Sequence, residues 1–175
     1  TSPSLTQPPT SQNTQQQMAV YTFSAETVSK VSARRLFKAM IVHRNETMQI
    51  VKPDVFKSNE ILHGDGGVGT IKKIHFADGH PFKSFQIRIE ELDVERMYCK
   101  YSIIEGDFLD ELEKIEYVVK YEEVGEGCKA KVTVHHHPKP GCSVNEEKAR
   151  AAEEKAKEVF KAVEDYLLAN PHVYA

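Results

Sequence analysis

One long helix is predicted by residues 143–169, which read SVNEEKARAAEEKAKEVFKAVEDYLLA. Ser143 and Glu146 have the spacing of a capping box, and Asn170-Pro171 ends the pattern. Between these ends, apolar side chains recur every three or four residues, at Ala149, Ala152, Ala156, Val159, Phe160, Val163, Tyr166 and Leu167. A helix from about Val144 to Ala169 would extend about 39 Å at about 1.5 Å per residue, long enough to cross a whole sheet.

The residues before this helix predict an antiparallel sheet. Short alternating runs recur at 69–76, 98–104 and 114–121. Turn sequences separate them, at Asp78-Gly79, Gly106-Asp107 and Gly125-Glu126-Gly127. A further strand begins near Val20, and helical spacing follows it at Leu36, Phe37, Met40 and Ile41. The predicted order of one strand, two short helices, six strands and one long helix is typical of an α+β fold with its helices on one sheet face.

The predicted long helix changes in bulk along its length. Its first half carries small residues such as Ala149 and Ala156, whereas its second half carries bulky ones such as Phe160 and Leu167. A curved sheet around such a helix would leave a hollow beside the alanines, lined by aromatic and aliphatic side chains. The alternative is that alanine occurs here only because it is the best helix former.

Composition favours one domain at 18–175. The chain has 175 residues, of which 40% are hydrophobic, and its formal net charge of -3 gives no reason to expect a specific nucleic-acid partner. Residues 1–17 contain no charged side chain and one apolar side chain, Leu5. We expect them to be a disordered tail or a remnant of recombinant expression, with Met18 as the natural start.

The cysteines favour a cytoplasmic location. Cys99, Cys128 and Cys142 form an odd set without a C-x-x-C pair, which is typical of reduced thiols. The sequence has no signal-peptide pattern and no apolar run near the roughly 20 residues that span a bilayer, so we expect neither secretion nor a membrane partner. We expect a monomer or a weak dimer.

A glycine-rich loop reads Gly64-Asp65-Gly66-Gly67-Val68-Gly69-Thr70. A nucleotide-binding loop would need a lysine before Thr70 and a helix after it, whereas a strand pattern follows this loop. We therefore interpret the stretch from Gly64 to Gly69 as a rigid hairpin loop.

Several motifs in order along the chain resemble the pathogenesis-related class-ten (major birch-pollen allergen) family of the START-like superfamily. They are the glycine-rich loop, Ala33-Arg34-Arg35-Leu36-Phe37-Lys38-Ala39, Ile104-Glu105-Gly106-Asp107, Leu112-Glu113-Lys114-Ile115, Lys139-Pro140-Gly141-Cys142 and Tyr166-Leu167-Leu168-Ala169-Asn170-Pro171. The resemblance implies a helix-grip fold, in which a seven-stranded curved antiparallel sheet wraps around a long C-terminal helix. Two short helices form a V beside it, and a hydrophobic cavity lies inside. Within the family, Gly79-His80-Pro81 and Tyr98-Cys99-Lys100-Tyr101 are most similar to the phenolic oxidative coupling protein of the hypericin pathway.

The resemblance also implies binding of amphipathic aromatic ligands in defence or stress. Family ligands include phytohormones such as cytokinin and abscisic acid, flavonoids and polycyclic phenolics. Positions that resemble the family's cavity lining are Met40, Phe56, Ile74, Phe76, Phe82, Cys99, Tyr101, Ile103, Ile115, Tyr117, Ala152 and Lys155. This chain departs from the family at Ser84, where an aromatic residue is usual, and at Cys99, where a tyrosine is common.

Enzyme interpretations compete with binding. The family's reported ribonuclease residues match Glu113, Glu164 and Tyr166, although surface ion pairs would also explain the two glutamates. A condensing enzyme, as in the family's norcoclaurine synthase branch, would use acids or bases such as Lys72, Lys155 and Glu105. Phenolic coupling would lack an electron acceptor, because the sequence offers no haem, flavin or copper site, and we expect no cofactor.

Two other interpretations are a metal site and a hormone receptor. His135 and His137 share one face of a predicted strand, but the sequence offers no third ligand nearby, and a solvent-facing strand end explains them. The related abscisic acid receptors inhibit a protein phosphatase when their loops close on ligand, and the glycine-rich loop here lacks their gate motif. Binding of a small aromatic ligand is therefore the favoured function, with no metal.

Overall fold

The computed structural model describes residues 19–175, so the predicted tail at 1–17 and the predicted start at Met18 lie outside the described residues. The strands are β1 (Tyr21–Ser29), β2 (Phe56–His63), β3 (Ile71–Phe76), β4 (Ser84–Asp93), β5 (Tyr98–Gly106), β6 (Leu112–Val124) and β7 (Gly127–Pro138). The helices are α1 (Ala33–Phe37), the π-helical η1 (Lys38–Val42), α2 (Arg44–Val51) and α3 (Glu146–Ala169). The α+β element order predicted from the sequence is confirmed.

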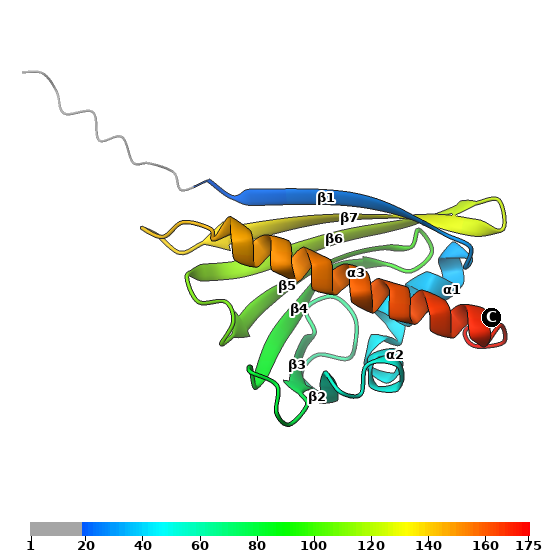
Figure 1. Ribbon diagram of the computed structural model, residues 1–175, viewed down its shortest axis with the longest axis horizontal. Coiled ribbons are helices and arrows are strands. Elements are labelled where there is room, and N and C mark those ends of the chain that lie inside the picture. Colours follow the sequence, from blue (N-terminus) through cyan, green and yellow to red (C-terminus); the bar gives the residue numbers. More distant parts are fainter. Residues whose placement is uncertain (1–18) are drawn as a thin grey trace, which may run out of the picture.

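All seven strands form one antiparallel sheet in the order β1-β7-β6-β5-β4-β3-β2. Strands β2 to β7 follow one another as neighbours, and β1 closes the sheet beside β7, with Tyr21 opposite His136 and Ser29 opposite Cys128. Register shifts between β4 and β5 add curvature to the sheet. Helix α3 crosses the concave face, and α1 and α2 lie next to its second half (Figure 1).

The long helix begins later than the sequence pattern predicted. Its N-cap is Asn145, whose side-chain oxygen accepts a hydrogen bond from the Lys148 backbone N–H at 3.1 Å. The predicted start near Val144 with Ser143 as the cap is therefore wrong, because the Asn145 amide already satisfies an N–H group of the first turn. The predicted end at Ala169 is confirmed.

The second half of α3 is fixed to α1 by packing and by hydrogen bonds. Four side chains of this contact are at most 1% exposed, namely Leu36, Phe37, Val163 and Leu167. Arg35 of α1 donates from Nε to the carbonyl of Val173 at 2.9 Å, and from Nη2 to the carbonyls of Leu167 at 3.0 Å and Asn170 at 2.8 Å. These contacts therefore fix the position of the C-terminal half of α3 relative to α1 and the sheet.

Candidate functional site

The candidate site lies on the concave face of the sheet, where most of the predicted lining residues meet. On β5 and β6 the register pairs Tyr101 with Tyr117 and Ile103 with Ile115. The rings of Tyr101 and Tyr117 are stacked, with centroids 5.0 Å apart and an interplanar angle of 8°. Cys99 shares their face, because it lies two residues before Tyr101 on the same strand.

The remaining inward residues come from β3 and from the helical region. Ile74 and Phe76 share one face of β3, and Phe56 of β2 packs near Phe76 with ring centroids 6.1 Å apart. Met40 and Phe56 pack against the core cluster beneath the second half of α3. Sequence positions from Met40 to Tyr117 are thus brought to one side of the sheet.

A second apolar cluster covers the other end of the concave face. Its members are Ile103, Leu109, Ile115 and Val134, with Phe23, Phe85, Ile87, Phe108, Leu112, Tyr117 and Val132 packed against them. Every member comes from a strand or from the loop between β5 and β6, and among the described residues α3 contributes none. The first half of α3 therefore leaves this apolar surface without a helix packed on it.

Exposure along α3 follows the same division. Ala156 lies on the same helix face as Phe160 and Val163, at spacings of four and seven residues. Val163 and Leu167 are completely buried, whereas Ala152 and Ala156 are exposed. Ala149 in the first turn is 3% exposed, so the small residues of the first half are not uniformly buried or exposed, and the exposed part of the inward helix face lies at Ala156.

The two stacked tyrosines lie deep in the protein and still keep accessible surface. Burial raises the pKa of both Tyr101 and Tyr117 above the usual phenol range, and the positive charge of Arg44 opposes this rise. Each side chain is nevertheless only partly buried, and neither hydroxyl has a hydrogen-bond partner within residues 19–175. Two unpaired phenol groups are thus available to a polar ligand atom.

Three further polar groups face the concave side. Lys72 lies two residues before Ile74 on β3, so both side chains are on the same face of the sheet, and Lys72 pairs with Ile87 of β4. Burial lowers the pKa of its ammonium group. Burial also lowers the pKa of His136, whose ring is 3% exposed and whose Nδ1 has no partner in the described part of the chain. On α3, Glu153 has a buried carboxylate oxygen that is likewise unpaired among the described residues, and burial raises its pKa.

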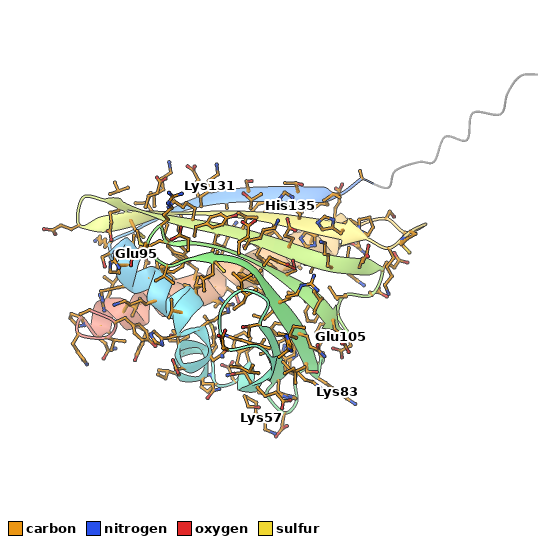
Figure 2. All side chains as sticks on the ribbon, turned by 180° about the vertical axis from the view of Figure 1, so that it is seen from behind. Lys57, Lys83, Glu95, Glu105, Lys131 and His135 are labelled. Carbon is orange, nitrogen blue, oxygen red and sulfur yellow. The ribbon has the colours of Figure 1, made fainter. Side chains whose placement is uncertain are left out.

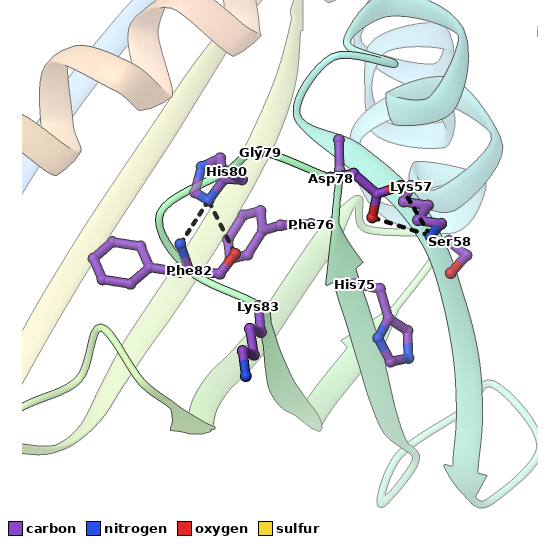
Figure 3. A pocket seen from close by; sticks show the side chains of 10 residues that line it. Lys57, Ser58, His75, Phe76, Asp78, Gly79, His80, Phe82 and Lys83 are labelled. Atoms are coloured by element: carbon purple, nitrogen blue, oxygen red, sulfur yellow. Dashed lines mark hydrogen bonds and ion pairs between the residues drawn. The ribbon is translucent and has the colours of Figure 1, made fainter.

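A pocket of about 370 Å³ opens at the β3–β4 loop (Figure 3). The ring of His80 stacks on Phe76 with centroids 4.1 Å apart, and His80 Nδ1 accepts a hydrogen bond from the Phe82 backbone N–H at 3.1 Å. Lys57 and Asp78 form an ion pair at 3.2 Å at the other side of the pocket. Phe76 lines this pocket and also lies on the concave face, so the pocket and the candidate site share this residue.

Some predicted lining residues are more exposed than a cavity wall requires. Phe82 is 36% exposed and lines the pocket at the loop, with its ring 5.6 Å from that of Phe108. Lys155 is exposed on α3, and Glu105 is exposed near the end of β5 (Figure 2). Among the acid or base candidates, only Lys72 is thus brought to the concave face.

The ribonuclease candidates lie apart. The pKa of the Cys128 thiol is raised to about 11 by burial, by the charge of Glu123 and by the charge of Glu164. This effect indicates that Glu164 lies on the side of Cys128. Cys128 is paired with Glu123 near the C-terminal end of β6, whereas Glu113 is at the start of β6. Ten residues of strand span about 33 Å, so the two glutamates do not face one phosphodiester. Glu164 instead pairs with Lys161 at 3.5 Å, and Tyr166 packs against the core.

The glycine-rich loop connects β2 to β3 and binds its own groups. The Gly66 N–H donates to Thr70 Oγ1 at 2.9 Å, and the Gly67 N–H donates to Asp65 Oδ1 at 3.1 Å. Gly69 donates to the carbonyl of Ile89 at 2.8 Å. These internal hydrogen bonds support the interpretation as a hairpin loop.

The neighbouring histidines lie on opposite faces of β7. His136 pairs with inward Ile115, so its neighbours His135 and His137 lie on the other face, and Figure 2 shows His135 there. His135 Nδ1 is 2.9 Å from Thr22 Oγ1. Within residues 19–175, no three His, Cys, Asp or Glu side chains are grouped so as to hold a metal ion. In the same range, no helix has the length and apolarity needed to cross a bilayer.

Sequence reasoning missed His136 and Glu153 as polar groups of the site, and it missed Arg44 of α2, whose charge acts on the two stacked tyrosines. Glu153 carried a usable signal, because it lies four residues after Ala149 and seven before Phe160, within the inward stripe of the helix. His136 was part of a recognised strand whose two faces could not be distinguished by pattern. No sequence signal pointed to Arg44.

The comparison with known families agrees with this geometry. Residues 18–170 match the model described as the Pathogenesis-related protein Bet v 1 family. The chain belongs to the Bet v 1 family. Among Bet v 1 relatives, "Probable intracellular pathogenesis-related protein T1" of Catharanthus roseus is 43% identical over 155 residues, covering 88% of this chain and 99% of that protein. "Major strawberry allergen Fra a 1.04" of Fragaria ananassa is 42% identical over 159 residues, covering 90% and 99%.

Solved structures show the same Bet v 1 fold. The crystal structure of Ara h 8.0201 has a TM-score of 0.78 at 32% identity and covers 87% of this chain and 100% of that one. Norcoclaurine synthase from Thalictrum flavum, in complex with dopamine and hydroxybenzaldehyde, has a TM-score of 0.67 at 22% identity and covers 97% and 98%. The family predicted from the sequence motifs and its seven-stranded curved sheet are confirmed.

Proposed function

We propose that this Bet v 1 protein binds amphipathic aromatic ligands in a hollow between the first half of α3 and the concave face of the sheet. The observation that carries the proposal is the apolar cluster of strands β4 to β7 on which no described residue of α3 packs. The exposure of Ala156 on the inward helix face agrees with an unfilled space beside it. A side chain that lies deep in a protein and keeps accessible surface, such as Tyr117, borders such a space.

The polar groups of the hollow fit a flat ligand with hydroxyl, carbonyl or amine groups. Lys72 and Arg44 offer donors, Glu153 offers an acceptor, and the phenol groups of Tyr101 and Tyr117 offer both. Burial of about 300 Å² of apolar ligand surface at about 25 cal/mol/Å² would contribute about 7 kcal/mol. After the ordering costs of binding, this contribution is consistent with micromolar affinity.

Relatives support this class of ligand and the biological setting. The norcoclaurine synthase structure with this fold contains two small aromatic molecules, dopamine and hydroxybenzaldehyde. The Catharanthus relative is described as an intracellular pathogenesis-related protein. We extend both properties to this chain, as a cytoplasmic defence or stress protein in which residues 18–175 form one ligand-binding domain. Cytokinin, abscisic acid, flavonoids and polycyclic phenolics are the ligands to test first.

A pair of substitutions on α3 tests the proposed hollow. Ala156→Phe places a ring on the inward face, whereas Ala151→Phe makes the same change at an exposed position on the opposite side of the helix. Fluorescence titration with an anilinonaphthalene sulfonate dye measures affinity. We expect Ala156→Phe to weaken binding about tenfold or more, because the new ring would occupy space that the dye needs, and a loss of about 1.4 kcal/mol in binding free energy is tenfold in affinity.

The control variant Ala151→Phe should bind the dye as the original protein does. Equal affinities for both variants and the original protein would show that the dye binds elsewhere. If the original protein bound neither the dye nor any of the candidate ligands, the carrier function would be refuted.

A further inference from the structure

Lys72 occupies an unusual position for a lysine. It lies on β3 in register with Ile87 of β4, and alternation along β3 puts it on the same face as Ile74, which is 9% exposed. Ile87 belongs to the apolar cluster beneath the first half of α3. The lysine side chain therefore starts from the wall of the proposed hollow.

The amine of Lys72 has no close charge partner. Thirteen ion pairs occur within residues 19–175, and Lys72 takes part in none of them. Loss of solvent lowers the pKa of its ammonium group, while the charges of Cys99 and Glu46 oppose this effect. Cys99 is 2% exposed and lies on β5, two strands away from β3 on the same concave face.

An unpaired amine in an apolar wall is a nucleophile. A lysine that loses solvent without gaining a carboxylate partner spends more time as the free amine, and a free amine attacks carbonyl carbon. The apolar residues of the same face, among them Ile74, Ile87 and Phe76, would hold a flat carbonyl compound on this face of the sheet.

We propose that Lys72 captures aromatic aldehydes as an imine inside the hollow. The inference rests on the proposed binding function and deepens it by naming a covalent site and a ligand class. The lone pair of Nζ attacks the carbonyl carbon, and transfer of a proton from nitrogen to oxygen gives a carbinolamine. Loss of the hydroxyl group and the second N–H proton as water forms the C=N bond. One amine and one aldehyde thus give one imine and one water, without an oxidant or a reductant.

Lys73 provides a matched control on the same strand. It is partly buried like Lys72, but it is the next residue, so it lies on the opposite face of the sheet. A reaction that depends only on a surface amine would modify Lys73 as readily as Lys72. A reaction that depends on the hollow would select Lys72.

Reductive trapping tests the proposal on the full chain. The protein is incubated with naphthaldehyde and cyanoborohydride, which reduces an imine to a stable secondary amine, and peptide mass spectrometry locates the adduct. We expect modification of Lys72 to exceed that of Lys73 by about tenfold or more. The Lys72→Met variant should lose this adduct, and the Lys73→Met variant should keep it. Comparable labelling of Lys72 and Lys73, or undiminished total labelling in Lys72→Met, would overturn the assignment.

Displacement of the naphthalene sulfonate dye by naphthalenemethanol separates this inference from the binding function. The alcohol has the same aromatic rings but cannot form an imine. If the alcohol displaces the dye from both the original protein and Lys72→Met while no adduct forms at Lys72, the imine proposal fails and the hollow remains supported. If neither the dye nor the alcohol binds, the proposed binding function and the imine proposal both fail.

Discussion

Replacement of Arg35 should release the C-terminal end of α3 from α1. The last turn of α3 consists of uncharged residues, so the carbonyls at this end rely on Arg35 for a cationic partner. The three carbonyls that it contacts belong to Leu167, Asn170 and Val173. A hydrogen bond to a charged group contributes about 1.5–3 kcal/mol, but bonds from one partly exposed guanidinium are not additive. We therefore expect Arg35→Ala to lower the free energy of unfolding by about 3 kcal/mol.

Urea denaturation followed by circular dichroism measures this loss. With a denaturant slope of about 2 kcal/mol/M, the midpoint should fall by about 1.5 M. Arg35→Lys should recover about half of the loss, because lysine keeps the charge but not the forked geometry that reaches several carbonyls.

Arg34 is the control for this prediction, since it is the preceding residue of α1, is exposed and has no ion pair within residues 19–175. Arg34→Ala should change the unfolding free energy by less than about 0.5 kcal/mol. Equal midpoints for Arg34→Ala and Arg35→Ala would refute the view that Arg35 fixes the helix.

Three other substitutions test local features. Gly64→Ala should lower the melting temperature by about 6 °C. Gly64 has a φ of +91°, and a new Cβ would lie 2.8 Å from Thr70 Cα, so we expect strain of about 2 kcal/mol. An unchanged melting temperature would argue against this loop geometry. Asn145→Ala should cost about 1 kcal/mol of stability and Ser143→Ala almost nothing, and the reverse order in urea denaturation would restore Ser143 as the helix cap. Burial lowers the pKa of His136, so the unfolded chain binds its proton more readily, and the stability that the neutral ring contributes is present above about pH 6.5 and lost below it. His136→Phe should therefore make the free energy of unfolding less dependent on pH between about pH 7 and pH 5. If the free energy of unfolding changed with pH as strongly in the variant as in the original protein, this assignment would be contradicted.

Local patterns in the sequence were sufficient for the order and type of the elements. The alternation at 98–104 and 114–121 became β5 and β6, and the spacing from Ala149 to Leu167 became α3. These signals work because the periods of a strand and a helix are properties of neighbouring residues. The helix cap was predicted at the wrong residue, because Ser143 and Asn145 both have capping side chains and only the path of the loop after Gly141 selects between them.

The sequence by itself also determined the contrast between the alanine half and the bulky half of α3, and the family motifs indicated a seven-stranded curved sheet around that helix. Only the tertiary structure decided the order of the strands in the sheet, in which β1 lies beside β7, and which charged side chains turn inward. Lys72, Glu153 and Arg44 come from three elements far apart in the chain, so their shared environment depends on sheet register and helix height. No local pattern encodes these two quantities, because they arise from contacts between distant residues such as Arg35 and Val173.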